Sequence, residues 1–90
     1  MTPLEKARNI GPKCAAELEA VGIGSLEELR RMGWEVAYEI WTAAFPDRIH
    51  AMAAYALIGA VEDCNCLSLP EDLKRRARRA TERMRAEKIA

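Results

Sequence analysis

The stretch Asn9-Ile10-Gly11-Pro12-Lys13-Cys14-Ala15 decides the fold of this chain of 90 residues. Pro12 follows a glycine and can begin a helix, because proline has a helical φ and lacks only an N–H that would be unpaired in the first turn. The segment Pro12–Ala20 predicts that helix, and Gly22 is suited to end it in the left-handed region. Two short helices joined by a tight turn of this composition indicate a helix–hairpin–helix unit.

A turn of this kind can bind an anion. Glycine lets the backbone come close to a phosphate, and the helix that starts there directs unpaired N–H groups and its dipole toward the anion. Such a contact reads the nucleic-acid backbone rather than the bases. The candidate phosphate-contacting residues are therefore Asn9, Ile10, Gly11 and Lys13.

Asn9 separates this turn from the common DNA-binding form, which has glycine on both sides of the apolar residue. Asparagine tolerates a positive φ, so the turn is expected to survive, but its side chain could obstruct a phosphate. The alternative interpretation is a turn that only packs two helices, with Ile10 in the core.

The rest of the chain also predicts helices, and no segment alternates long enough to indicate a strand. Ser25 and Glu28 form a capping box for a second helix, which ends at Gly33. That helix should turn Leu26, Leu29 and Met32 inward. A third helix is expected over residues 34–44, and its inward positions at i, i+3, i+4 and i+7 are Ala37, Ile40, Trp41 and Ala44.

Two further helices complete the predicted domain. The fourth, from about Arg48 to Asp63, is apolar almost all round, which is typical of a central buried helix. The fifth covers about residues 69–88, with a capping box at Ser68 and Glu71 and with Pro70 in its first turn. Its apolar residues form one narrow stripe: Leu73, Ala77, Ala80 and Met84. The sequence thus predicts a single all-α domain over residues 1–90, a compact five-helix fold with a helix–hairpin–helix-like unit at its N-terminus.

The charge is unevenly distributed along the chain. Lys and Arg number 14, as do Asp and Glu, and this zero net charge argues against a general polyanion binder. Residues 1–70 hold 6 basic and 10 acidic side chains, however, whereas residues 71–90 hold 8 basic and 4 acidic ones. The basic residues of the last helix are Lys74, Arg75, Arg76, Arg78, Arg79, Arg83, Arg85 and Lys88. One interpretation is that they contact nucleic-acid phosphate or the acidic surface of a partner. The other is that they form a solvated face with helical salt bridges.

Four aromatic residues, Trp34, Tyr38, Trp41 and Phe45, share one face of the third predicted helix. They could form a platform on which bases stack, but no Lys or Arg is interleaved with them. Core packing or a partner-facing apolar patch is the favoured interpretation.

Other classes of function have little support in the sequence. Cys64 and Cys66 lack a second pair of ligands, so we expect no metal site, and nothing indicates a cofactor. The sequence has no nucleotide-binding loop and no catalytic pairing, so we expect no enzyme. The uncharged run around Ala51–Val61 covers 11 residues, fewer than the roughly 18 that a membrane span needs. With a charged N-terminus and three cysteines, we expect a cytoplasmic protein with reduced thiols.

Several segments in order resemble one family. They are Arg8–Lys13, Ala20–Ile23, Ser25–Arg30, Gly33, Glu35–Tyr38 and Tyr55–Ala60. Together they are similar to the C-terminal domain of TfoX/Sxy proteins, over about residues 4–70. The resemblance implies an all-helical domain related to helix–hairpin–helix folds and a link to the regulation of natural DNA uptake. It also implies that asparagine is ordinary at position 9, and that this chain is a stand-alone copy without the N-terminal α/β domain of full-length members.

Two functional hypotheses follow. The first is a non-catalytic regulatory module that contacts DNA backbone through the hairpin and the basic last helix. The second is a protein-interaction or dimerisation module that does not bind nucleic acid. If the two basic regions face the same way, DNA is the favoured partner, whereas opposite faces leave DNA binding unsupported.

Overall fold

Five α-helices and three short 3-10 helices make up the computed structural model, which describes residues 2–89 and the side chains of residues 2–87. The α-helices are α1 (Pro12–Ala20), α2 (Leu26–Met32), α3 (Trp34–Ala44), α4 (Ala51–Glu62) and α5 (Glu71–Ile89). The 3-10 helices are η1 (Leu4–Lys6), η2 (Pro46–Arg48) and η3 (Cys66–Ser68). The described residues include no strand, and the predicted all-α, five-helix fold is confirmed.

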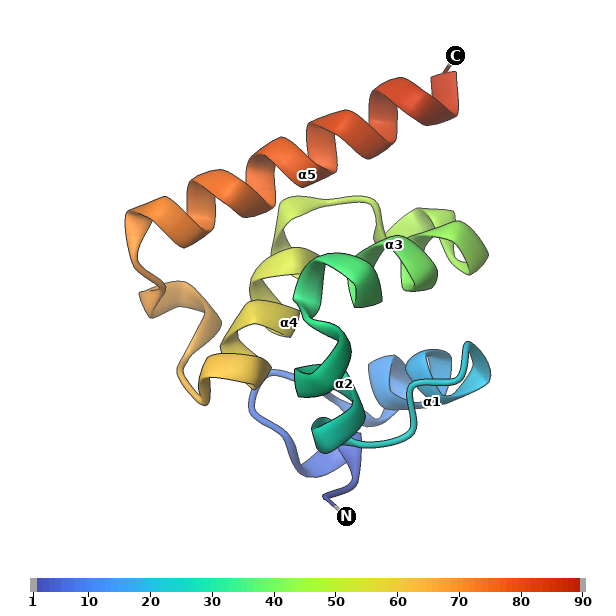
Figure 1. Cartoon of the computed structure of the whole chain (residues 1–90), viewed down its shortest axis with the longest axis vertical. Coiled ribbons are helices and arrows are strands. Elements are labelled where there is room, and N and C mark those ends of the chain that lie inside the picture. The colour runs from blue at the N-terminus through green and yellow to red at the C-terminus, as the bar shows by residue number, and fades with distance from the viewer. Residues whose placement is uncertain (1, 90) are drawn as a thin grey trace.

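The helices are distributed along the longest axis of a molecule that measures 38 × 29 × 21 Å. Helix α5 forms one end, and α1 lies with the N-terminal segment toward the other end (Figure 1). Helix α4 packs against both α3 and α5 in the middle of the molecule. None of the described helices is both long enough and apolar enough to cross a bilayer.

The N-terminal elements follow their local signals closely. Helix α1 begins at Pro12 and ends at Ala20, and Gly22 beyond it has a φ of +92°. The Ser25 hydroxyl accepts a hydrogen bond from the backbone N–H of Glu28 at 3.2 Å. The Glu28 carboxylate accepts in return from the N–H of Gly24 at 3.0 Å, one residue before the cap. The predicted limits of α1 and α2 are therefore confirmed, with a small variation in the capping box.

Helix α3 has the predicted limits but is rotated relative to the predicted core face. Ala37 and Trp41 are buried as expected, whereas Ile40 is 36% exposed and Ala44 is exposed, so those two predictions were wrong. The aromatic face points inward instead: Trp34, Tyr38 and Trp41 are buried, and Phe45 is half-buried. Because large aromatic rings bury more apolar surface than aliphatic side chains do, they set the orientation of the helix. Core packing of the aromatic residues is confirmed.

Helix α4 starts at Ala51, three residues later than predicted, because Arg48 belongs to η2. His50 is its N-cap, and its Nδ1 accepts a hydrogen bond from the N–H of Ala53 at 3.2 Å. The helix is buried along one side but is not buried all round, since Met52 is 47% exposed.

Helix α5 packs through the predicted stripe. Ala77, Ala80 and Met84 are buried, and Leu73 is half-buried. The capping box predicted at Ser68 is absent from the hydrogen bonds of residues 2–87, because Ser68 ends η3. The carbonyl of Pro70 accepts from the N–H groups of Leu73 and Lys74 instead, each at 3.1 Å.

Candidate binding surfaces

The turn before α1 leaves part of its backbone open to solvent. Ile10 is buried at 4% exposure, whereas Gly11 and Lys13 are exposed. Within the described chain, the N–H groups of Gly11, Lys13 and Cys14 have no acceptor, because the helical hydrogen bonds begin with Ala15 N–H donating to the Gly11 carbonyl. Free N–H groups at the start of a helix can bind an anion. Gly11 has a φ of −87°, and a Cβ there would meet nothing within 4 Å.

Asn9, in contrast, has a role within the fold. Its φ of 69° supplies the left-handed conformation that glycine would otherwise provide. Its Nδ2 donates to the carbonyl of Cys64 at 2.9 Å, and its Oδ1 accepts from the N–H of Cys66 at 3.2 Å. Both ends of the amide therefore hold the loop that follows α4.

Gly59 makes room for this contact. A Cβ at position 59 would overlap the Nδ2 of Asn9 and would lie 2.7 Å from the carbonyl oxygen of Cys64. The partners of Asn9 lie more than fifty residues away in the chain, so the turn sequence carries no sign of them. A glycine within an otherwise alanine-rich helix was the available signal, because it often marks a close approach of two backbones.

Lys13 lies beside a charged cluster that joins α1, α3 and η2. The Oε1 of Glu17 accepts from Trp41 Nε1 at 2.9 Å and from Arg48 Nε at 2.8 Å. Its Oε2 accepts from Arg48 Nη2 at 2.9 Å. The hydrogen bond from Arg48 is the main reason why the pKa of Glu17 is lowered to about 2; burial opposes the shift, and Trp41 and the charge of Lys13 add to it. This cluster, which sequence reasoning missed, stabilises the fold next to the hairpin.

On the side of α5 nearest α3, two arginines pair with carboxylates of α3. Arg76 forms an ion pair with Glu35, and its guanidinium lies 5.8 Å from the centre of the Trp34 ring. Arg83 pairs with Glu39 at 3.1 Å. Cations on this flank therefore attach α5 to α3.

The other flank of α5 is bonded within the chain as well. Arg78 donates to Glu71 at 2.8 Å and to the Tyr55 hydroxyl at 3.2 Å, and the hydrogen bond from Arg78 lowers the pKa of Glu71. Arg85 donates to the Ile49 carbonyl at 3.3 Å. Lys74 donates to the Leu67 carbonyl, also at 3.3 Å.

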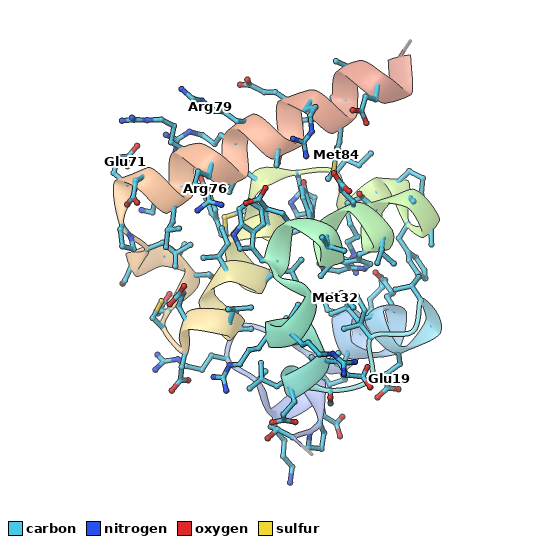
Figure 2. The ribbon with its side chains drawn as sticks, viewed as in Figure 1. Glu19, Met32, Glu71, Arg76, Arg79 and Met84 are labelled. Atoms are coloured by element: carbon cyan, nitrogen blue, oxygen red, sulfur yellow. The ribbon has the colours of Figure 1, made fainter. Side chains whose placement is uncertain are left out.

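Arg75 and Arg79 remain on the outer ridge of α5 without an ion-pair partner in the described chain. Figure 2 shows Arg79 on the side of α5 turned away from the other helices, and Met84 on the side that faces α3. Asp72 and Glu82 stand at helical spacing from these arginines, so the ridge carries mixed charge. The side chain of Lys88 lies outside the described residues.

The predicted basic residues thus do not form one free face, and they lie far from the hairpin. Helix α5 occupies one end of the molecule, and the turn before α1 lies toward the other (Figure 1). The structure brings Asn9 of the hairpin together with Cys64 and Cys66. It brings the α5 cations together with carboxylates of α3, the Tyr55 hydroxyl of α4, and the carbonyls of Ile49 and Leu67.

The outward side of α3 carries exposed apolar side chains. Val36 is 47% exposed and Ile40 is 36% exposed, and the exposed Ala43 shares their helical face. The other large exposed apolar residues of the described chain, Met52 and Leu67, belong to α4 and η3. We call Val36, Ile40 and Ala43 the α3 surface. Sequence reasoning missed it because it placed Ile40 in the core.

A groove of about 480 Å³ adjoins this surface at the C-terminal end of α3. It lies between α3, the segment around η2 and the second half of α5, and Ala43 belongs to both the surface and the groove. We call it the α3–α5 groove. Its lining residues are Glu39, Thr42, Ala43, Pro46, Ile49, Met84 and Glu87.

The cysteines form no cluster with other ligating groups. All three are free thiols and half-buried. Within the described residues, no three His, Cys, Asp or Glu side chains are arranged to hold a metal ion.

Comparison with known proteins assigns the family. A search of curated proteins found no match to the chain. Among solved structures, an uncharacterised protein from Listeria monocytogenes, in a triclinic crystal form, has the same fold, with a TM-score of 0.85 and 24% sequence identity. The similarity covers 91% of this chain and 92% of the Listeria chain. The family model described as the TfoX C-terminal domain matches residues 1–81, which extends the resemblance from residue 70 into α5. The chain belongs to the TfoX C-terminal domain family.

Proposed function

We propose that the chain is a non-catalytic protein-binding module and that the α3 surface is its main contact. The observation that carries this proposal is the exposure of Val36 and Ile40 on one face of a helix. Full burial of such a side chain contributes about 1.5–3 kcal/mol, so covering the part that is still exposed would contribute about 1 kcal/mol for each residue. A partner that covers both, and the groove beside them, would gain a useful part of its binding free energy there.

The distribution of charge supports a protein partner over DNA. The hairpin and α5 lie toward opposite ends of the 38 Å long axis, so their basic residues do not form one continuous surface (Figure 1). Most cations of α5 already bond to groups of the same chain, and phosphate would have to compete with these contacts. The regulation of DNA uptake that the resemblance implies would then act through contact with another protein.

A non-catalytic role is supported by the surroundings of the groups whose pKa is shifted. Burial raises the pKa of Tyr38, whose hydroxyl bonds to Thr81 and to the His50 carbonyl inside the core. The lowered pKa values of Glu17 and Glu71 arise from hydrogen bonds with arginines. Each of these groups belongs to a contact that holds the fold together. Glu17 also borders a groove of about 360 Å³ between α1 and η2, but both of its carboxylate oxygens already bond to Arg48 or Trp41.

The α3 surface is tested by Ile40→Glu, with Met52→Glu on α4 as the matched control. Circular dichroism should show that both variants fold, because both side chains are exposed. In affinity capture from the source cell, followed by quantitative mass spectrometry, proteins retained by the wild type and by Met52→Glu should be lost from Ile40→Glu. Equal retention by the two variants would refute the proposal. Sedimentation shows whether the partner is a second copy: in that case the wild type forms a dimer and Ile40→Glu stays monomeric.

Contact with phosphate through the turn is a second candidate, favoured by the unpaired N–H groups of Gly11, Lys13 and Cys14. It predicts binding to duplex DNA at low salt, with an affinity that falls steeply as salt is added. Lys13→Glu should weaken this binding more than Arg31→Glu, a charge reversal at an exposed position on α2. Fluorescence anisotropy with labelled DNA measures both, and no binding at low salt would exclude this candidate.

A further inference from the structure

We propose that His50 is a pH-sensitive cap of α4: the neutral imidazole holds the first turn of the helix, and uptake of a proton releases it. His50 is the only histidine in the chain. Among side chains, imidazole is the one that ordinarily changes its charge between pH 5 and pH 8. The cap lies in the segment between α3 and α4, so this property does not depend on the proposed contact at the α3 surface.

The hydrogen bond at the cap requires an unprotonated Nδ1. The backbone nitrogen of Ala53 lies 3.2 Å from Nδ1 of His50, and its N–H can only donate. The same N–H also donates to the carbonyl of His50, at 3.1 Å. A neutral ring with its hydrogen on Nε2 can accept at Nδ1, whereas an imidazolium has a hydrogen on each nitrogen. Protonation would therefore direct one N–H group at another, and the side-chain cap would be lost.

The start of α4 also disfavours a positive charge on the ring. His50 has extended backbone, with a φ of −154° and a ψ of 154°, and the helix begins at the next residue. The positive end of the helix dipole lies there, and a cation beside it is unfavourable. The first turn of α4 contains no acidic residue that would offset the charge.

Charged groups of the neighbouring elements do little to favour a protonated ring. In the described chain, no carboxylate forms an ion pair with His50. On α5, Arg85 brings a positive charge to the carbonyl of Ile49, at 3.3 Å. Burial raises the pKa of Tyr38 on α3, so its hydroxyl stays neutral between pH 5 and pH 8. The other charged side chains near this segment are Glu39, Asp47 and Glu87, which are exposed to water, and Arg48, which pairs with Glu17.

The segment that carries the cap also holds α3 and α5, so a proton on His50 would act beyond α4. The Tyr38 hydroxyl donates to the His50 carbonyl at 3.1 Å and bonds to Thr81 of α5 at 2.9 Å. Arg85 of α5 bonds to the preceding residue, Ile49. When the first turn of α4 opens, both connections to α5 lose their fixed acceptor or neighbour.

The sign of the pH dependence follows from proton uptake. In an opened chain the imidazole is in water and takes up a proton freely, whereas the folded cap holds it neutral. The opened states therefore bind more protons than the folded state, and stability falls as the pH is lowered from 8 to 5.

The protonation state of the cap is tested on the wild-type chain. A long-range ¹H–¹⁵N NMR spectrum at pH 8 distinguishes a ring with its hydrogen on Nε2 from one with its hydrogen on Nδ1. Because the chain has a single histidine, the signals are assigned without a variant. We expect the Nε2 form, and a substantial share of the Nδ1 form would overturn the inference.

The pH dependence is tested with His50→Asn, because asparagine is a good N-cap and does not titrate. Urea unfolding at pH 7.5 and at pH 5 gives the unfolding equilibrium constant of the wild type and of the variant. As the pH is lowered, we expect the constant of the wild type to rise about fivefold relative to that of His50→Asn. Hydrogen exchange at pH 5 should be faster in the wild type at the start of α4 and around Thr81. A ratio of the two unfolding constants that is the same at both pH values would overturn the inference.

Discussion

Substitution of Glu17 by glutamine should weaken the fold in a way that depends on pH. Glu17 links α1 to Trp41 of α3 and to Arg48 of η2 through three hydrogen bonds. Glutamine has nearly the same shape and keeps one carbonyl oxygen as an acceptor, but it removes the charge that Arg48 pairs with. The variant therefore isolates the electrostatic part of the cluster.

The magnitude follows from the pKa of Glu17, which falls from 4.5 to about 2 in the folded protein. Each pKa unit corresponds to about 1.4 kcal/mol, so the carboxylate contributes about 3 kcal/mol to the free energy of unfolding. Both side chains of the pair are mostly shielded from water, with exposures of 13% for Glu17 and 22% for Arg48. Because the folded pKa is the lower one, this stability is fully present above pH 4.5 and is lost as the pH falls through about 2.

Urea unfolding of the wild type and of Glu17→Gln at several pH values measures the effect. Circular dichroism follows the helices, and tryptophan fluorescence reports on Trp41 within the cluster. We expect the wild type to be more stable by about 3 kcal/mol at pH 7, and this difference to shrink steadily between pH 4.5 and pH 2. Glu19→Gln, at an exposed position of the same helix, is the control and should show no such trend.

The comparison of two proteins at each pH removes the contribution of the other carboxylates, which titrate in both. A difference between wild type and Glu17→Gln that is the same at pH 7 and pH 2 would refute the electrostatic reasoning. A difference below about 0.5 kcal/mol at pH 7 would show that the pair contributes no more than an ordinary surface salt bridge.

Three further substitutions test local contacts by urea unfolding. Gly59→Ala should destabilise the fold by about 1–3 kcal/mol, because the new Cβ meets the Asn9 amide and a backbone carbonyl. Gly11→Ala, whose Cβ meets nothing, is the control and should change stability by less than about 0.5 kcal/mol. Equal effects of the two substitutions would contradict the close contact at Gly59. His50→Ala should cost about 1 kcal/mol through loss of the α4 cap, and His50→Asn should restore it. Thr81→Val leaves the buried Tyr38 hydroxyl with one partner and should lower the free energy of unfolding by about 1 kcal/mol. A variant more stable than the wild type would show that the hydrogen bond between Thr81 and Tyr38 does not stabilise the fold.

Local signals in the sequence were sufficient for most helix limits, because capping and helix termination depend on a few adjacent residues. Pro12, Ser25 and Gly33 mark helix ends where the structure has them. His50 was not recognised as a cap, since histidine is not among the usual capping residues, and α4 was therefore started too early. The error at Ser68 has a similar origin, because a capping signal was present but the residue was used by η3.

The binding surfaces were harder to predict because they depend on pairing between distant segments. The sequence identified the cations of α5 but not Glu35 and Glu39, which engage two of them. The orientation of α3 could not be decided from periodicity alone, since Trp41 belongs both to the aromatic face and to the predicted stripe that includes Ile40. Packing against α4 and the side-chain contacts with α5 show that the aromatic face is buried, and the exposed face that remains is the proposed site.

The exposed aliphatic residues of the α3 surface are difficult to explain by folding alone. Val36 and Ile40 are β-branched, and in an exposed helix each costs a few tenths of a kcal/mol relative to alanine, glutamate or lysine. The core contacts of α3 are made by Trp34, Tyr38 and Trp41, which lie on the opposite face. Polar residues at positions 36 and 40 would therefore preserve the core and favour the helix. A contact that covers these two side chains in the working state of the protein gives their presence a physical reason, and that contact is what Ile40→Glu is designed to remove.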